Sequence, residues 1–263
     1  MADDSKDCPF LVDMATVTHT ESLNNGNSPE ITLYTNHGCP WAHRAHITLR
    51  ALNVPYKEVI IPLDRPRDPW YLEINPRGLV PSVKITTADG KIKDEIITES
   101  GIVSTFLAEM FPDSKFWPRS EENPLLRARI NFFVDTWFTM VNKLMYPILR
   151  AEGEEKDKLG SQLVAAVKKE IEPLLENAKP FFGGSKHITL AEALTASFVV
   201  RYQAYTDGGL MPSVLKELNA LPNYSKWSKA VCNEDSVTYI FDGPEISKLT
   251  AERIAKLNAE AKK

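Results

Sequence analysis

One cysteine in this chain has the surroundings of a reactive nucleophile. Cys39 lies in the run Asn36-His-Gly-Cys-Pro-Trp-Ala-His-Arg44, after an alternating stretch at residues 31–35 that is typical of a short buried strand. Pro40 suits the first turn of a helix, so a helix should begin directly after Cys39. Unpaired N–H groups and the positive end of the helix dipole stabilise an anion there, which favours the nucleophilic thiolate.

The position that would hold a second cysteine in a dithiol motif is occupied by Ala42. No internal disulfide can form, so thiol chemistry at Cys39 needs a second thiol from another molecule. The alternative interpretation of Cys39 is a small buried cysteine that happens to begin a helix. Cys8 falls in a predicted tail and Cys232 in a helical stretch, where a packed structural thiol is expected. Three scattered cysteines indicate neither a disulfide framework nor a metal site.

Three motifs together resemble a known family. The Cys39 run, Asn75-Pro-Arg-Gly-Leu-Val-Pro81 and Glu99-Ser100 resemble a cysteine-type glutathione transferase of the omega class, over roughly residues 31–233. The Cys-Pro-Trp-Ala-His-Arg box also resembles glutathionyl-hydroquinone reductases. The resemblance implies a thioredoxin-like α/β domain followed by an all-α domain, with glutathione as co-substrate and a homodimeric assembly.

The same resemblance implies which residues bind glutathione. A cis bond between Val80 and Pro81 would let the backbone of Val80 pair with the tripeptide, and Glu99 and Ser100 would bind its γ-glutamyl end at a helix start. Outside the family context, a Glu-Ser pair at a helix start is usually only a cap. For the glycine carboxylate we predict Arg65, at a position closely similar to that of a lysine in omega enzymes, with Arg67 and Arg77 as nearby competitors.

Aromatic residues are expected to form the acceptor pocket between the two domains. Flat or apolar electrophiles suit such a surface, although most of these side chains should belong to the core. The histidines His37, His43 and His46 show no metal-ligand pattern with acidic or thiol partners, so no metal is predicted. His43 is expected to be an exposed helix residue rather than a proton-transfer group. The candidate pocket residues are Trp41, Phe132, Trp137, Phe138 and Met140.

Composition limits the classes of partner. The chain has 263 residues, of which 43% are hydrophobic, and a formal net charge of −4. The absence of a basic excess argues against nucleic acid or an anionic membrane as the main partner. No apolar run reaches membrane-spanning length, and the acidic start lacks a secretory leader. A cytoplasmic location is expected by default.

The periodicity predicts two domains. Residues 1–29 are predicted to be a flexible extension, residues 30–111 a thioredoxin-like domain, residues 112–122 a linker, and residues 123–263 an all-α domain with a tail helix. After the strand at 31–35 and its helix, strands are expected at 56–61, 82–86 and 91–95, with an Asp-Gly hairpin turn between the last two. Helices are expected at 70–74 and 98–110. The order is β-α-β-α-β-β-α.

These features favour a glutathione-dependent thiol transferase that acts through a mixed disulfide on Cys39. The acceptor would be a small hydrophobic or glutathionylated compound. Two alternatives stay open. One is an enzyme that conjugates glutathione to an electrophile, which should survive the change Cys39→Ser. The other is a non-catalytic binding protein of the same fold, with tight ligand binding and negligible turnover.

Overall fold

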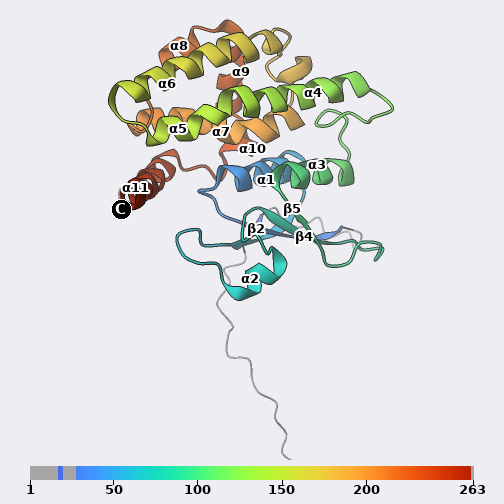
Figure 1. Ribbon diagram of the computed structural model, residues 1–263. Helices are drawn as coiled ribbons and strands as arrows, with labels where there is room; N and C mark the ends of the chain where they lie inside the picture. Colours follow the sequence, from blue (N-terminus) through green and yellow to red (C-terminus); the bar gives the residue numbers. More distant parts are fainter. Residues whose placement is uncertain (1–16, 20–27, 262–263) are drawn as a thin grey trace, which may run out of the picture.

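A five-stranded sheet forms the centre of the first domain in the computed structural model, which describes residues 17–19 and 28–261 (Figure 1). The strand order is β1-β3-β2-β4-β5, with β2 and β3 parallel and the other neighbouring pairs antiparallel. Helices α1 and α3 lie on the face toward the helical domain, and α2 lies on the other (Figure 1). The bounds are β1 Val17–His19, β2 Glu30–Thr35, α1 Pro40–Ala51, β3 Tyr56–Ile60, α2 Pro69–Ile74, β4 Ser82–Thr86, β5 Glu95–Thr98 and α3 Ser100–Met110.

Both faces of this sheet are covered by apolar side chains, because successive residues of a strand point to opposite sides. Leu33 belongs to a core with Leu49 of α1 and Val103 of α3. Its neighbour Tyr34 belongs to a second core with Tyr71 of α2. The predicted order of strands and helices is therefore confirmed, and β2 is held between α1 and α2 just before the chain reaches Cys39.

Two element boundaries differ from the sequence prediction. The strand expected at 91–95 lies at β5, because Thr87 bonds with Ile92 through its backbone and hydroxyl and closes a local turn before the chain can pair with β4. The helix expected from residue 98 begins at Ser100, since Glu99 has a positive φ of 69° that interrupts helical geometry. In the predicted extension, residues 17–19 form β1 and pair with β3, whereas residues 1–16 and 20–27 lie outside the described residues.

The second domain is a bundle of helices around a buried central helix (Figure 1). The central helix, α7, begins with a capping box, in which Thr189 and Glu192 satisfy each other's free N–H groups. Trp137 and Trp227 pack in the core beside it. The bounds are α4 Pro124–Thr136, α5 Met145–Arg150, α6 Gly153–Ala166, α7 Leu190–Asp207, α8 Leu215–Asn219, α9 Pro222–Cys232, α10 Asp235–Thr238 and α11 Gly243–Ala261, with short π and 3-10 turns at Trp137–Val141, Asn142–Leu144, Val167–Ile171, Pro173–Leu175 and Phe182–Gly184.

The segment between the domains packs tightly against both. Phe116 and Trp117 are buried, and the carbonyl oxygen of Phe116 accepts a hydrogen bond of 2.9 Å from the N–H of Leu190. The guanidinium of Arg127 lies 4.1 Å from the centre of the Trp117 indole ring. These contacts fix α7 relative to the sheet. Within the described residues, none of the helices is both long enough and apolar enough to cross a membrane.

Candidate active site

Cys39 lies in the turn between the end of β2 and the start of α1. It is the N-cap residue of that helix, with extended backbone angles, and Pro40 is the first helical residue. Two hydrogen bonds of 3.0 Å shape the turn, from the N–H of Cys39 to the carbonyl of Asn36 and from the N–H of Gly38 to the side chain of Asn36. No side chain caps α1. The positive end of the helix is therefore directed at the half-buried sulfur.

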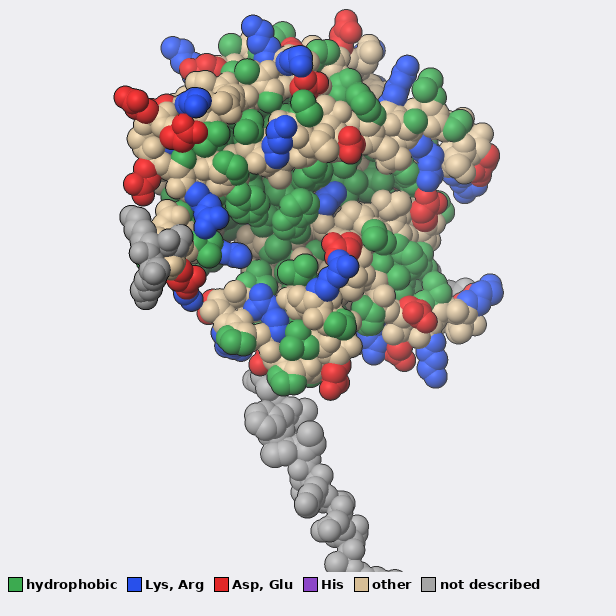
Figure 2. Space-filling view, viewed as in Figure 1, with side chains coloured by type: hydrophobic (Ala, Val, Ile, Leu, Met, Phe, Trp, Pro, Cys, Tyr) green, Lys and Arg blue, Asp and Glu red, His purple; other side chains and the backbone are tan. Residues whose placement is uncertain are grey.

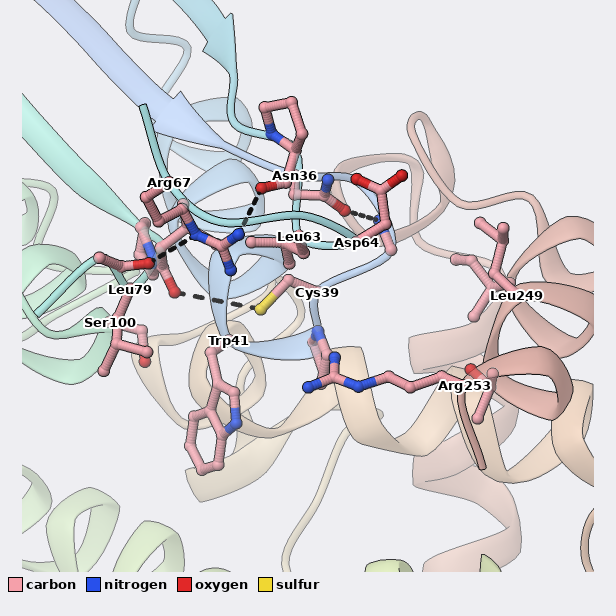
Figure 3. Close-up of a pocket in the computed structure, with 18 of the residues that line it drawn as sticks. Asn36, Cys39, Trp41, Leu63, Asp64, Arg67, Leu79, Ser100, Leu249 and Arg253 are labelled. Atoms are coloured by element: carbon pink, nitrogen blue, oxygen red, sulfur yellow. Dashed lines mark hydrogen bonds between the residues drawn. The ribbon is translucent and has the colours of Figure 1, made fainter. Parts of the chain in front are cut away.

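A large cavity opens beside this sulfur, with a volume of about 1010 Å³. In Figure 3, the sulfur of Cys39 lies between Ser100 and Leu79 on one side and Leu249 and Arg253 of α11 on the other. The Sγ atom is 4.0 Å from the carbonyl oxygen of Val80. The cavity thus joins the first domain to the C-terminal helix.

The Val80-Pro81 segment lines the cavity and contains a cis peptide bond, as the family resemblance implied. Side chains from the α2 region hold it in place: the Tyr71 hydroxyl and the Asn75 amide both donate to the carbonyl oxygen of Leu79. Asn75 and Tyr71 also contact the Ser82 hydroxyl at 3.1 Å. Residues 79–82 are therefore anchored from behind, with Val80 beside Cys39.

Glu99 and Ser100 also line the cavity, at the start of α3. Ser100 Oγ accepts a hydrogen bond of 2.8 Å from Arg44, which leaves the serine's own proton available for an anionic ligand. The carboxylate of Glu99 forms a 2.6 Å ion pair with the exposed Arg77. A ligand ammonium would compete with Arg77 for this carboxylate.

Of the two arginines in the loop after β3, Arg67 lines the cavity and the exposed Arg65 does not. Arg67 is held by hydrogen bonds to the carbonyl oxygens of Gly78, at 2.9 Å, and of Pro62, at 2.6 Å. Figure 3 shows its guanidinium on the same side of the cavity as Leu79. The structure thus offers Arg67 at the place for which the sequence suggested Arg65.

Of the five predicted acceptor residues, only Trp41 lines the cavity. Trp137 is completely buried in the helical core, and Phe138 stacks on Trp41 with ring centres 5.3 Å apart. Phe132 and Met140 are exposed outside the cavity. The opposite side of the cavity is formed by residues that the sequence did not assign to the pocket: Tyr146, Ile246, Leu249, Thr250, Arg253, Lys256 and Leu257.

Two buried guanidinium groups lie near the turn that carries Cys39. Arg44 donates to Ser100 and lies 4.9 Å from the centre of the Phe138 ring, and burial lowers its pKa to about 9. Arg201 of α7 is fully buried and reaches the carbonyl oxygens of His37 and Gly38 at 3.4 and 3.3 Å. Within the described part of the chain, neither arginine pairs with a carboxylate, so their charge favours an anion in the cavity.

Two expectations about histidines are wrong. His43 is fully buried rather than exposed: its Nε2 lies 2.8 Å from the carbonyl oxygen of Val237, and its Nδ1 lies 3.1 Å from Arg201. His37 and His46 do meet an acidic partner, because one nitrogen of each lies within 4.8 Å of the other and of a carboxylate oxygen of Glu58. Sequence spacing did not show this group, since β3 supplies the carboxylate.

Cys232 has the surroundings of a structural thiol, as the sequence suggested. Burial raises the pKa of its thiol to about 11.

Comparisons with known proteins agree with this geometry. Residues 38–110 match the family described as the glutathione S-transferase N-terminal domain. Mouse glutathione S-transferase omega-1 is 26% identical over 192 residues, which cover 70% of this chain and 75% of that protein. Pyrimidodiazepine synthase of Drosophila melanogaster is 33% identical over 106 residues, 40% of either chain.

A solved structure shares the architecture of both domains. The crystal structure of glutathione transferase Omega 2C from Trametes versicolor superimposes with a TM-score of 0.72 at 24% identity, over 86% of this chain and 99% of that chain. At this identity the likeness shows the fold. Together these comparisons confirm the predicted resemblance to omega-class proteins and the predicted fold class. The resemblance of the cysteine box to glutathionyl-hydroquinone reductases stays a prediction.

Proposed function

We propose that this chain, which is similar to omega-class glutathione transferases in sequence and fold, is a glutathione-dependent thiol transferase that works through a mixed disulfide on Cys39. One observation carries this proposal: the sulfur of Cys39 lies at a helix start and borders a large cavity, with Ala42 in place of a second cysteine. A thiolate so placed can exchange with an external disulfide but cannot resolve the product itself.

Glutathione is proposed to bind along the first-domain side of the cavity. The backbone of Val80 would pair with its cysteinyl residue, and the Ser100 hydroxyl and Glu99 would bind its γ-glutamyl carboxylate and ammonium. Arg67 would bind the glycine carboxylate. Each of these residues lines the cavity beside Cys39, which supports the assignment. The glutathione sulfur would then lie next to Sγ of Cys39.

The proposed reaction has two exchange steps. The Cys39 thiolate attacks the glutathione sulfur of a glutathionylated acceptor, so that a Cys39–glutathione disulfide forms while the acceptor leaves as a thiolate and takes up a proton. A second glutathione, as its thiolate, attacks the glutathione sulfur of that disulfide. Oxidised glutathione leaves, and the Cys39 thiolate is restored. The acceptor's disulfide is reduced, and one free glutathione is oxidised, because it forms oxidised glutathione with the glutathionyl group that the acceptor carried.

The acceptor is proposed to bind between Trp41 and α11. Apolar side chains from α11, among them Ile246 and Leu249, line this part of the cavity beside the cationic Arg253. This surface suits a small hydrophobic compound or the apolar part of a glutathionylated one. The cytoplasm is the proposed location, since its glutathione keeps thiols reduced.

A homodimer is the proposed assembly, through the apolar surface that α3 and α4 present. Leu79, Ile102, Leu125 and Phe132 are each more than half exposed. Figure 2 shows hydrophobic side chains gathered between the two domains on the face where α3 and α4 lie. Exposed apolar patches of this kind mark interfaces. Light scattering should give twice the chain mass for the wild type and the monomer mass for Phe132→Glu.

Mass spectrometry after incubation with oxidised glutathione tests the proposed function. We expect a single glutathione adduct, mapped to the peptide that contains Cys39, and the same adduct in the matched control Cys232→Ser. An enzyme that conjugates glutathione to electrophiles would instead keep its transferase activity in Cys39→Ser. A binding protein would bind glutathione tightly without forming an adduct. Either of these two results would rule out the mixed-disulfide mechanism.

A further inference from the structure

Three potential metal ligands meet beside the turn that carries Cys39. Nε2 of His37 lies 3.1 Å from Oε2 of Glu58, and Nε2 of His46 lies 3.9 Å from the same oxygen. One donor atom from each residue lies within 4.8 Å of the other two. Ligand atoms around a tetrahedral zinc ion, each about 2 Å from the metal, are separated by about 3.3 Å. Small movements of these side chains would therefore bring all three atoms onto one ion.

The hydrogen bonds of His46 are compatible with a tautomer in which Nε2 carries no proton. The hydroxyl of Tyr239 donates to the carbonyl oxygen of His46 at 3.2 Å, and the hydroxyls of Tyr239 and Tyr56 are 2.8 Å apart. Nδ1 of His46 lies 2.8 Å from the Tyr56 hydroxyl. The Tyr239 hydroxyl also lies 3.2 Å from Nδ1. In this tautomer, Nδ1–H donates to Tyr56, Tyr56 donates to Tyr239, and Tyr239 donates to the carbonyl oxygen. A partner that fixes the far nitrogen in this way is typical of histidines that bind metals.

The surrounding residues show how a metal ion would reach this site and which hydrogen bond it would displace. Glu58 and His46 are buried, but the His37 side chain is 41% exposed and opens the group to solvent. The Thr35 hydroxyl lies 2.8 Å from Nε2 of His46, where it donates to the nitrogen lone pair. A metal ion would replace this hydrogen bond. The hydroxyl could then rotate, since serine and threonine hydroxyls both donate and accept.

We propose that His37, His46 and Glu58 form a binding site for one zinc ion, with a water molecule as the fourth ligand. Two imidazoles and one carboxylate suit zinc, whereas magnesium and calcium prefer oxygen ligands alone. The three residues come from the turn before α1, from α1 itself and from β3. A bound ion would therefore tie the turn at residues 36–39 to the sheet. The site stands apart from the proposed glutathione chemistry, because none of its ligands lines the cavity.

Zinc titration of the full chain tests this site. The parent protein carries Cys39→Ser, which removes the neighbouring thiol as a competing ligand. In competition with a fluorescent zinc chelator, the parent should bind one equivalent of Zn²⁺. His37→Ala and Glu58→Gln should weaken this binding at least tenfold, since even outer-shell changes cost about 10–100-fold. His187→Ala, which alters an exposed histidine elsewhere, should bind zinc like the parent.

Hydrogen exchange provides a second readout that does not depend on activity. Zinc should slow amide exchange at residues 36–39 in the parent and leave it unchanged in His37→Ala. The latter variant should fold, since His37 is partly exposed, and circular dichroism can check this. The proposal is overturned if the parent binds no stoichiometric zinc, if His37→Ala binds zinc as tightly as the parent, or if only the protein with an intact Cys39 binds it.

Discussion

Acidification should destabilise this fold through His43, and the reason lies in how its ring is held. Nε2 donates to the carbonyl oxygen of Val237 at 2.8 Å, so Nδ1 is the acceptor for Arg201 at 3.1 Å. A proton on Nδ1 would place a second positive charge against the guanidinium in a fully buried site. Burial, with a further contribution from Arg201, holds the pKa of His43 well below its usual value of 6.5.

The sign and size of the effect follow from proton linkage. A histidine whose pKa is depressed in the folded state contributes stability above its unfolded-state pKa, and this stability is lost as the pH falls below that value. The unfolded chain takes up the proton near pH 6.5, while the folded chain does not. Between pH 7 and pH 5 the free energy of unfolding should therefore fall by about 2 kcal/mol from His43 alone, at about 1.4 kcal/mol per pH unit.

Urea unfolding at pH 5, 6 and 7, in the presence of a chelator, measures this loss. Other groups titrate in every variant, so the informative quantity is the difference in pH dependence between wild type and His43→Gln. The glutamine variant should lose about 2 kcal/mol less over this range. His187→Gln, at an exposed histidine, should keep the wild-type dependence. Equal pH dependence in wild type and His43→Gln would refute the reasoning.

Three further predictions concern glutathione, the acceptor and the fold. Arg67→Ala should raise the KM for glutathione about tenfold, the cost of losing roughly 1.4 kcal/mol of charge-assisted bonding, while Arg65→Ala should leave it near wild type in a steady-state assay. Leu249→Ala should raise the KM for hydrophobic acceptors and leave that for glutathione unchanged, which substrate-dependence curves will separate. Thr189→Ala should lower the free energy of unfolding by about 1 kcal/mol in urea titrations, because its hydroxyl caps α7 and donates to Glu192.

The parts of the site that sequence predicted are those set by local pattern. The alternation of residues 31–35, the turn formers before Cys39 and Pro40 after it specify a strand, a turn and a helix within a few residues. The capping box that opens α7 is another local feature, since Thr189 and Glu192 are three residues apart. For such features the neighbouring residues alone decide the conformation.

The parts that sequence missed depend on contacts between distant segments. Arg65 and Arg67 are two residues apart, and hydrogen bonds to the carbonyl oxygens of Pro62 and Gly78 hold Arg67 at the cavity. His43 is buried because the chain around Val237, 194 residues later, crosses over α1. The sequence suggested Trp137 for the acceptor pocket, but packing within the bundle buries it, and α11 lines the cavity instead.

The turnover of Cys39→Ser tests the central claim most directly. With glutathione and hydroxyethyl disulfide as substrates, the wild type should show ping-pong kinetics, because the mixed disulfide forms before the second glutathione binds. Cys39→Ser should lose this activity, since a hydroxyl cannot form the intermediate, whereas Cys232→Ser should retain it. Thiol-transfer turnover in Cys39→Ser equal to that of the wild type would contradict the account.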